Sequence, residues 1–261
     1  YLWTEYKYGR DEADLHNQEN ISHYFEEYFQ KKVSLIRFQY EKREDMFDRH
    51  SYQKGGAVLH MLRKYLGDEA FFEGLKLYLK ENQFQSVEIH NLRMAFEKVC
   101  GEDLNWFFNQ WFFGIGHPYI EASWDFNEAD GNVRIHLKQV QDVEKRGLFR
   151  VPLDIDIYLG KTKKRTRVLL DSLRQTFVVH VGGHTRPNLL VVDAERALVG
   201  RIIQKLSPEE AAWQLQNAPL YGDREQALDE ILSVQNEPGM SALLSLAMRD
   251  PFWKVRQMAI E

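Results

Sequence analysis

The chain has 261 residues, of which 44% are hydrophobic, 13% aromatic and 28% charged. This composition is typical of a globular protein rather than a disordered or fibrous one. The net charge of −5 mixes both signs, so it gives no reason to expect a nucleic acid or an anionic membrane as partner. Cys100 is the single cysteine, which excludes an internal disulfide and a multi-cysteine metal site. No run of 18 apolar residues occurs, so no segment of this chain is predicted to cross a membrane.

Both ends of the chain lie inside helical patterns. Residues 1–6 read as the interior of an amphipathic helix with no capping residue before it, and residues 255–261 stop with no glycine or proline. We therefore expect a fragment of a longer protein.

Residues 1–117 are predicted to be helical. One apolar stripe has helical spacing and consists of Leu15, Ile21, Tyr24, Phe25, Tyr28 and Phe29. A buried helix over 52–66 ends at Gly67, and Asp68 and Glu69 suit the first turn of the next helix. Two more helices are predicted over 89–101 and 103–113, the latter dense in aromatic residues, and the segment 114–118 breaks the pattern.

The segment Ser51–Leu62 is unusual because Gly55 and Gly56 fall in the first turns of its helix. Each glycine costs a helix about 1 kcal/mol relative to alanine, and the usual reason for keeping one is the close approach of another backbone or of a ligand. Tyr52 just before them is a phenol that donates a hydrogen bond without carrying charge at neutral pH. Taken alone, the segment favours a buried helix with a glycine contact and a tyrosine at its rim.

Behind Pro118 the hydrophobic period changes from about 3.6 to about 2. Strands are predicted over residues 119–126, 133–137, 151–159, 166–170, 176–181 and 189–192, with turns at Asp130–Gly131, Gly160–Lys161 and Pro187–Asn188. Their spacing predicts an antiparallel β-sandwich over residues 118–205.

The residues 206–261 are helical again from Ser207–Pro208 onward. Arg224 and Arg256 each begin an Arg-x-x-Ala pattern, 32 positions apart, and Asp250–Pro251 precedes the second copy. This repetition predicts the start of a HEAT-like array of stacked helix pairs.

No complete active site follows from motif counting. The nine histidines contain neither H-E-x-x-H nor a pair at i, i+4 on one helix. His16 and His23 are predicted to be surface residues, Cys100 a packing residue, and His60 a hydrogen-bonded core or cleft histidine that stays a minor candidate. The sequence also lacks a nucleophile elbow, a P-loop and a dinucleotide fingerprint.

Two motifs resemble the zinc aminopeptidases of the gluzincin group, the family of aminopeptidase N and leukotriene hydrolase. The first is Tyr52-Gln53-Lys54-Gly55-Gly56-Ala57-Val58-Leu59, followed by Met61-Leu62 and Leu66–Phe71. The second runs from Asp103-Leu104 through Phe107 and Trp111 to Gly116-His117-Pro118. The order of a helical part, a sandwich and a helical array is similar as well. Two features depart from the family pattern. Gln53 stands where the family often has an acidic residue, and the glycine pair before Ala57 stands where the family often has a single glycine and then alanine.

The resemblance implies a zinc-dependent enzyme that removes N-terminal residues from peptides. It places the zinc ligands, the general-base glutamate and the motif that reads the free amine of the peptide upstream of Tyr1, so no metal ligand is expected here and this chain alone is expected to be inactive. The one catalytic position it retains is Tyr52, whose phenol is expected to stabilise the oxyanion formed when water attacks the scissile carbonyl.

The expected fold is therefore multidomain α + β. It consists of the helical C-terminal part of a thermolysin-like catalytic domain (1–117), an antiparallel β-sandwich (118–205) and the start of a HEAT-like array (206–261). The rival hypothesis is a non-catalytic scaffold of the same fold that binds other proteins. The retention of Tyr52 within its lysine-glycine context favours the enzyme. An unrelated helical domain joined to a sandwich is a third alternative.

Overall fold

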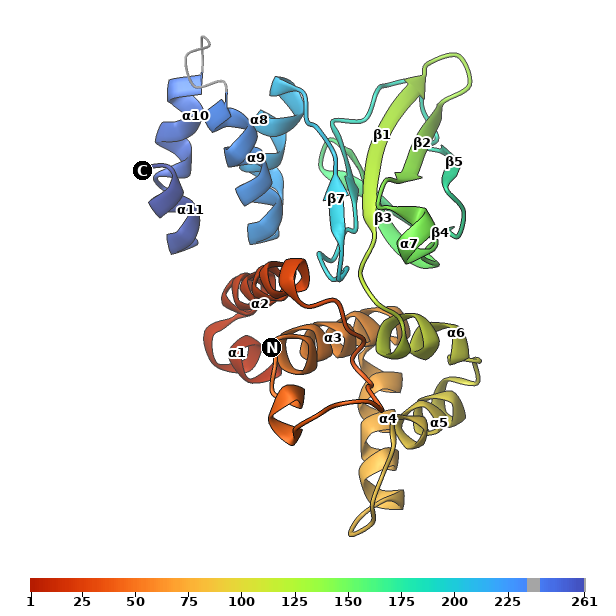
Figure 1. Cartoon of the computed structure of the whole chain (residues 1–261). Coiled ribbons are helices and arrows are strands. Elements are labelled where there is room, and N and C mark those ends of the chain that lie inside the picture. Colours follow the sequence, from red (N-terminus) through yellow and green to blue (C-terminus); the bar gives the residue numbers. More distant parts are fainter. Residues whose placement is uncertain (234–239, 261) are drawn as a thin grey trace.

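The computed structural model describes residues 1–233 and 240–260. The helices of its first part lie below two β-sheets, and the last helices lie beside the sheets (Figure 1). The first part contains α1 (Leu2–Tyr8), α2 (Arg10–Gln30), α3 (Gly55–Leu66), α4 (Asp68–Glu81), α5 (Ile89–Cys100) and α6 (Asn105–Phe108). Short 3₁₀ and π-helical turns add Arg43–Met46, His50–Lys54 and Asn109–Phe113. No helix within the described residues is long and apolar enough to cross a membrane.

The predicted helical pattern of residues 1–117 is confirmed in outline. Gly67, at φ +84°, separates α3 from α4, and Asp68 and Glu69 occupy the first turn of α4. The apolar stripe of α2 is buried except for its last member, Phe29, which is 70% exposed. The predicted helix 103–113 is interrupted, because its second half is a π-helical turn.

Within the described residues, seven strands form two sheets. The first has the order β5-β2-β1-β7 and the second the order β4-β3-β6. Their bounds are β1 (Tyr119–Asn127), β2 (Asn132–Gln139), β3 (Val151–Leu159), β4 (Thr162–Leu170), β5 (Arg174–His180), β6 (Leu189–Val192) and β7 (Arg201–Ile203). One short helix, α7 (Val143–Arg146), interrupts them. The expectation of a wholly antiparallel arrangement was wrong, because β7 pairs with β1 in parallel.

Side chains from both sheets belong to one hydrophobic core. Ile135 of β2 and Ile155 of β3 are fully buried in it, together with Trp111 from the aromatic segment before the sheets. The first helical part and the sheets therefore share buried apolar surface, which fixes them against each other. A sandwich remains our interpretation of these two sheets.

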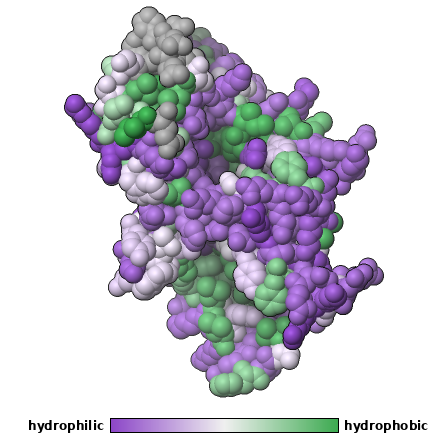
Figure 2. Space-filling model, turned by 60° about the vertical axis from the view of Figure 1, so that its left-hand side comes forward, coloured by the Kyte–Doolittle hydropathy of each residue, from purple (hydrophilic) through white to green (hydrophobic). Residues whose placement is uncertain are grey.

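The last part contains α8 (Pro208–Asn217), α9 (Tyr221–Ser233), α10 (Met240–Ala247) and α11 (Trp253–Met258). Ser207 caps α8 through a capping box with Glu210, as the sequence predicts. In Figure 2 hydrophobic residues gather beside the grey atoms at the top, where α10 lies. Part of α10 is thus uncovered.

The two Arg-x-x-Ala copies make equivalent contacts. Arg224 donates to the carbonyl oxygens of Pro219 (2.9 Å) and Ala218. Arg256 donates to those of Pro251 (2.9 Å) and Asp250. The repeat in the sequence thus corresponds to a repeated contact, while the HEAT-like array stays a prediction.

Candidate active-site turn

Tyr52 lies on a π-helical turn, His50–Lys54, that leads directly into α3. The amide of Lys54 donates to the carbonyl of Arg49 (3.0 Å), which widens the turn by one residue relative to an α-helix. The Tyr52 side chain is 60% exposed, and its ring contacts Phe47 at a centroid distance of 6.1 Å. The turn therefore presents the phenol to solvent.

The residues just before Tyr52 are fixed to neighbouring elements. Both the amide and Nδ1 of His50 contact the Glu27 carboxylate of α2, at 3.2 and 2.8 Å. The amide of Ser51 donates to Asp48 (2.8 Å), and the Ser51 hydroxyl accepts from Arg37 (2.9 Å). The exposed phenol is thus carried by a backbone whose position is set by charge-assisted hydrogen bonds.

The residue that closes the turn, Lys54, points into the core. It is fully buried, its Nζ donates to the carbonyl oxygen of Gly116 (3.3 Å), and it lies 5.3 Å from the ring centroid of Tyr24. Burial lowers the pKa of Lys54 to about 8. Among the described residues no carboxylate pairs with this amine.

A chain of buried polar groups continues from the same carbonyl. Tyr24 also donates to Gly116 O (3.3 Å), Nδ1 of His117 lies 3.0 Å from the Tyr24 hydroxyl, and Nε2 lies 3.2 Å from that of Tyr119. A neutral His117 with its proton on Nδ1 donates to the Tyr24 hydroxyl oxygen, and its Nε2 accepts from the Tyr119 hydroxyl. The Tyr24 hydroxyl then donates its own proton to Gly116 O. Burial, aided by the charge of Lys54, lowers the pKa of His117 to about 3. The ring is therefore neutral at physiological pH.

One cluster of potential metal ligands adjoins this turn, formed by Glu27, Asp48 and His50. Their ligand atoms lie within 4.8 Å of one another. However, Lys31 and Arg37 already form ion pairs with Asp48. Partial burial raises the pKa of Asp48, but the hydrogen bonds from these two cations lower it well below its ordinary value. A divalent cation here would face two positive charges, so the cluster does not fit the zinc ion that the resemblance implies.

The two glycines differ in their surroundings. A Cβ on Gly55 would lie 3.4 Å from Leu35, an ordinary packing contact, whereas a Cβ on Gly56 would meet nothing within 4 Å. Of the two expected reasons for these glycines, the close approach of another backbone does not hold for Gly56 within the described residues, and the approach of a ligand stays a prediction. The open side of Gly56 is the exposed side of the helix start that follows Tyr52.

We expect Gly56→Ala to raise the free energy of unfolding of this chain by about 0.5–1 kcal/mol, because alanine is the better helix former and meets no obstacle. Urea denaturation measures this change. Gly74→Ala is the matched control in α4, where a Cβ would lie 2.4 Å from the Phe96 ring, and it should destabilise. A destabilised Gly56→Ala protein would show that the described surroundings are incomplete at this position.

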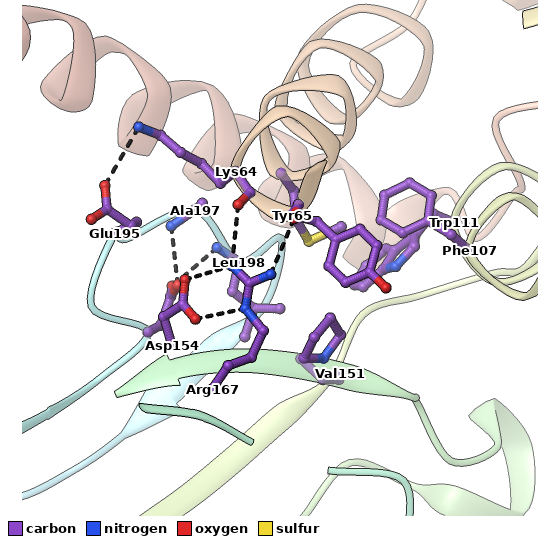
Figure 3. Close-up of a pocket in the computed structure, with 13 residues that line it drawn as sticks. Lys64, Tyr65, Phe107, Trp111, Val151, Asp154, Arg167, Glu195, Ala197 and Leu198 are labelled. Atoms are coloured by element: carbon purple, nitrogen blue, oxygen red, sulfur yellow. Dashed lines mark hydrogen bonds and ion pairs between the residues drawn. The ribbon is translucent and has the colours of Figure 1, made fainter. Parts of the chain in front are cut away.

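A cavity of about 40 Å³ lies at the opposite end of α3. Figure 3 shows Arg167 of β4 reaching across it: the guanidinium binds Asp154 through two hydrogen bonds (2.7 and 2.9 Å) and donates to the carbonyl oxygens of Tyr65 (3.1 Å) and Lys64. A space of this size holds a few water molecules rather than a substrate. The cavity lies where the sheet contacts α3. There the Arg167 guanidinium donates to carbonyl groups at the C-terminus of α3, which have no partner within the helix.

The surroundings of the minor candidate residues indicate no part in a site. His60 is buried on α3 with its ring 3.8 Å from that of Tyr1, and burial lowers its pKa to about 3. His16 and His23 are exposed, and Cys100 is partly buried against the core, as predicted. Sequence reasoning missed the burial of Lys54, His50 and His117. The only available signal was a lysine two positions after the tyrosine, a pattern that normally indicates a solvated side chain.

The structure as a whole is similar to that of an aminopeptidase. It matches the crystal structure of Legionella pneumophila aminopeptidase A in complex with aspartic acid with a TM-score of 0.76 and 16% sequence identity. The match covers 96% of this chain and 29% of the other. At this identity the match shows the fold.

Sequence comparison finds relatives of one segment of the chain. Residues 8–111 match the peptidase family M1 domain. Aminopeptidase N of Lactococcus lactis subsp. lactis is 33% identical over 106 residues, which cover 40% of this chain and 12% of the relative. Aminopeptidase M1 of Arabidopsis thaliana is 28% identical over 129 residues, covering 49% and 14%.

Residues 8–111 thus resemble the peptidase family M1 domain, and the predicted resemblance is confirmed. An unrelated helical domain is excluded for this segment. The chain spans 12% and 14% of the length of these two relatives.

Proposed function

We propose that this chain is part of a zinc-dependent aminopeptidase that hydrolyses N-terminal residues from peptides, and that Tyr52 stabilises the oxyanion of that reaction. The observation that carries the proposal is the contrast within one turn, where an exposed phenol stands on a backbone held by buried and charged groups. Catalytic hydrogen-bond donors act best when they are fixed before the charge develops.

The exposed surface of the helical part that carries Tyr52 supports the proposal that this chain belongs to a larger protein. Many exposed large apolar side chains belong to the same helical part as Tyr52, among them Trp3, Tyr6, Tyr8, Phe29, Phe38, Tyr40 and Phe47. In Figure 2 the lower half, where these helices lie, shows hydrophobic residues in a hollow below a hydrophilic belt. Exposed apolar surface of this kind normally contacts other protein, which fits a chain that spans a small part of its relatives.

The metal would be bound by residues other than the described cluster, whose donors do not fit it. When bound, zinc supplies Lewis-acid chemistry at the scissile carbonyl. The residues of this chain contribute a neutral donor at the position where the oxyanion forms.

We expect the full-length protein to hydrolyse an aminoacyl-anilide substrate, to lose this activity on treatment with a chelator and to regain it with zinc. The isolated chain should show no turnover at the same zinc concentration. Release of the anilide measures both, and the chelated protein with excess magnesium serves as the control. Turnover by the isolated chain would contradict the assignment of the ligands to another part of the protein.

The non-catalytic scaffold remains the rival. A H-E-x-x-H motif encoded upstream of Tyr1 supports the enzyme, and its absence supports the scaffold. A full-length protein that carries the motif and binds zinc without hydrolysing any aminoacyl-anilide would also favour the scaffold.

A further inference from the structure

Lys54 is the least expected side chain in the candidate site. A charged amine removed from water is costly unless a counter-ion or several hydrogen bonds compensate it. Within the described residues its Nζ has one hydrogen-bond acceptor, Gly116 O, and it also lies over the Tyr24 ring. Methionine would fill the same space without this cost. A contribution to stability therefore does not explain why a lysine occupies this position.

Its position relates Lys54 to Tyr52. The two residues belong to the same π-helical turn and point in opposite directions, since the phenol is 60% exposed and the amine is fully buried. A π-helical turn, with its hydrogen bond from Lys54 back to Arg49, is an uncommon conformation that is frequent at functional sites. A long side chain anchored in the core limits how far such a turn can rotate or slide.

The anchor itself, Gly116 O, is held by a second donor and by its backbone conformation. Gly116 has φ +95°, and a Cβ there would lie 2.9 Å from the Tyr28 hydroxyl, so its carbonyl is oriented by a conformation that only glycine adopts easily. Tyr24 donates to the same oxygen from α2. Lys54 therefore ties the turn of Tyr52 to a point that α2 and the entry to β1 also fix.

We propose that Lys54 is a positioning residue for the phenol of Tyr52, an inference that rests on the proposed function. Its hydrogen bond to Gly116 O, the one found within the described residues, holds the π-helical turn in the position from which the phenol reaches the oxyanion. The amine does not touch the substrate. It acts through the backbone of its own turn.

The test is a double-mutant cycle in the full-length protein with Tyr52→Phe and Lys54→Met. We expect Lys54→Met to lower kcat about tenfold to hundredfold, the effect of displacing a catalytic group by about 1 Å, with KM and zinc content unchanged. In the Tyr52→Phe background the same change should have no further effect on kcat, because the donor it positions is already absent. Lys76→Met, at an exposed lysine of α4, is the matched control and should leave kcat unchanged.

The outcomes separate the two proposals. If Tyr52→Phe leaves kcat unchanged, the role of the phenol fails and the inference about Lys54 fails with it. If Tyr52→Phe lowers kcat but Lys54→Met does not, or if the two losses multiply, only the positioning role is overturned. If Lys54→Met prevents folding, Lys54→Gln replaces it in the cycle, because glutamine is polar but uncharged and its shorter side chain loses the hydrogen bond to Gly116 O. Its loss of kcat should likewise vanish in the Tyr52→Phe background, and losses that multiply overturn the inference.

Discussion

Replacement of Tyr52 by phenylalanine is expected to lower the kcat of the full-length protein by about 10²–10³, the usual effect of losing one oxyanion donor. Phenylalanine keeps the ring and its contact with Phe47, and the side chain is mostly exposed, so stability should not change. The loss should appear in kcat rather than KM, because the hydrogen bond strengthens as the negative charge develops. Steady-state hydrolysis of an aminoacyl-anilide measures it.

Zinc content measured on the same preparation should equal that of the unchanged protein. Tyr40→Phe is the matched control, since Tyr40 is another exposed tyrosine (57%) of the same helical part, and it should leave kcat unaltered. A Tyr52→Phe protein with full turnover would remove Tyr52 from the reaction.

Arg224→Met is expected to have the largest effect on stability, about 3–5 kcal/mol, because it leaves a buried carboxylate without its partner. Arg224 and Asp250 are 6% and 8% exposed and are joined by a hydrogen bond of 2.8 Å. Arg224 also binds Asp11 of α2 (2.9 Å). The substitution therefore weakens the attachment of α9 to the first helical part as well. The free energy of unfolding in urea measures the change.

The second copy of the repeat offers the control. Arg256 makes the equivalent contacts to carbonyl oxygens, and no salt bridge to a carboxylate is found for it within residues 1–233 and 240–260. Arg256→Met should therefore destabilise the chain much less than Arg224→Met. Equal losses from the two substitutions would show that the carbonyl contacts, and not the buried carboxylate, carry the effect.

The strands were the part of the fold that the sequence predicted best. Val151–Leu159 was predicted with its observed bounds, because alternation between a buried and an exposed face leaves a period of two along the chain. The strand Arg201–Ile203 was not predicted. Three residues are too few to show a period, and the parallel pairing with β1 depends on where the chain returns in space.

Tyr52 was the one part of the candidate site that could be predicted from the sequence. Tyr52 stood out through a motif, but its role stays a proposal. The π-helical turn beneath it could not be predicted, since its extra residue is stabilised by contacts to Glu27 and Gly116, which lie 23 and 62 positions from their partners. The burial of Lys54 was hidden for the same reason, because hydropathy assigns every lysine to the surface.

Gly116 also bears on how the whole chain moves. A glycine followed closely by Pro118 reads as a flexible link between the helices and the sheets, where a hinge would be expected. Its carbonyl instead accepts hydrogen bonds from Lys54 and Tyr24. A rotation of the sheets against the helices at this point would break the hydrogen bond of the buried Lys54 amine, which has no other acceptor among the described residues, so we do not expect a hinge at this link.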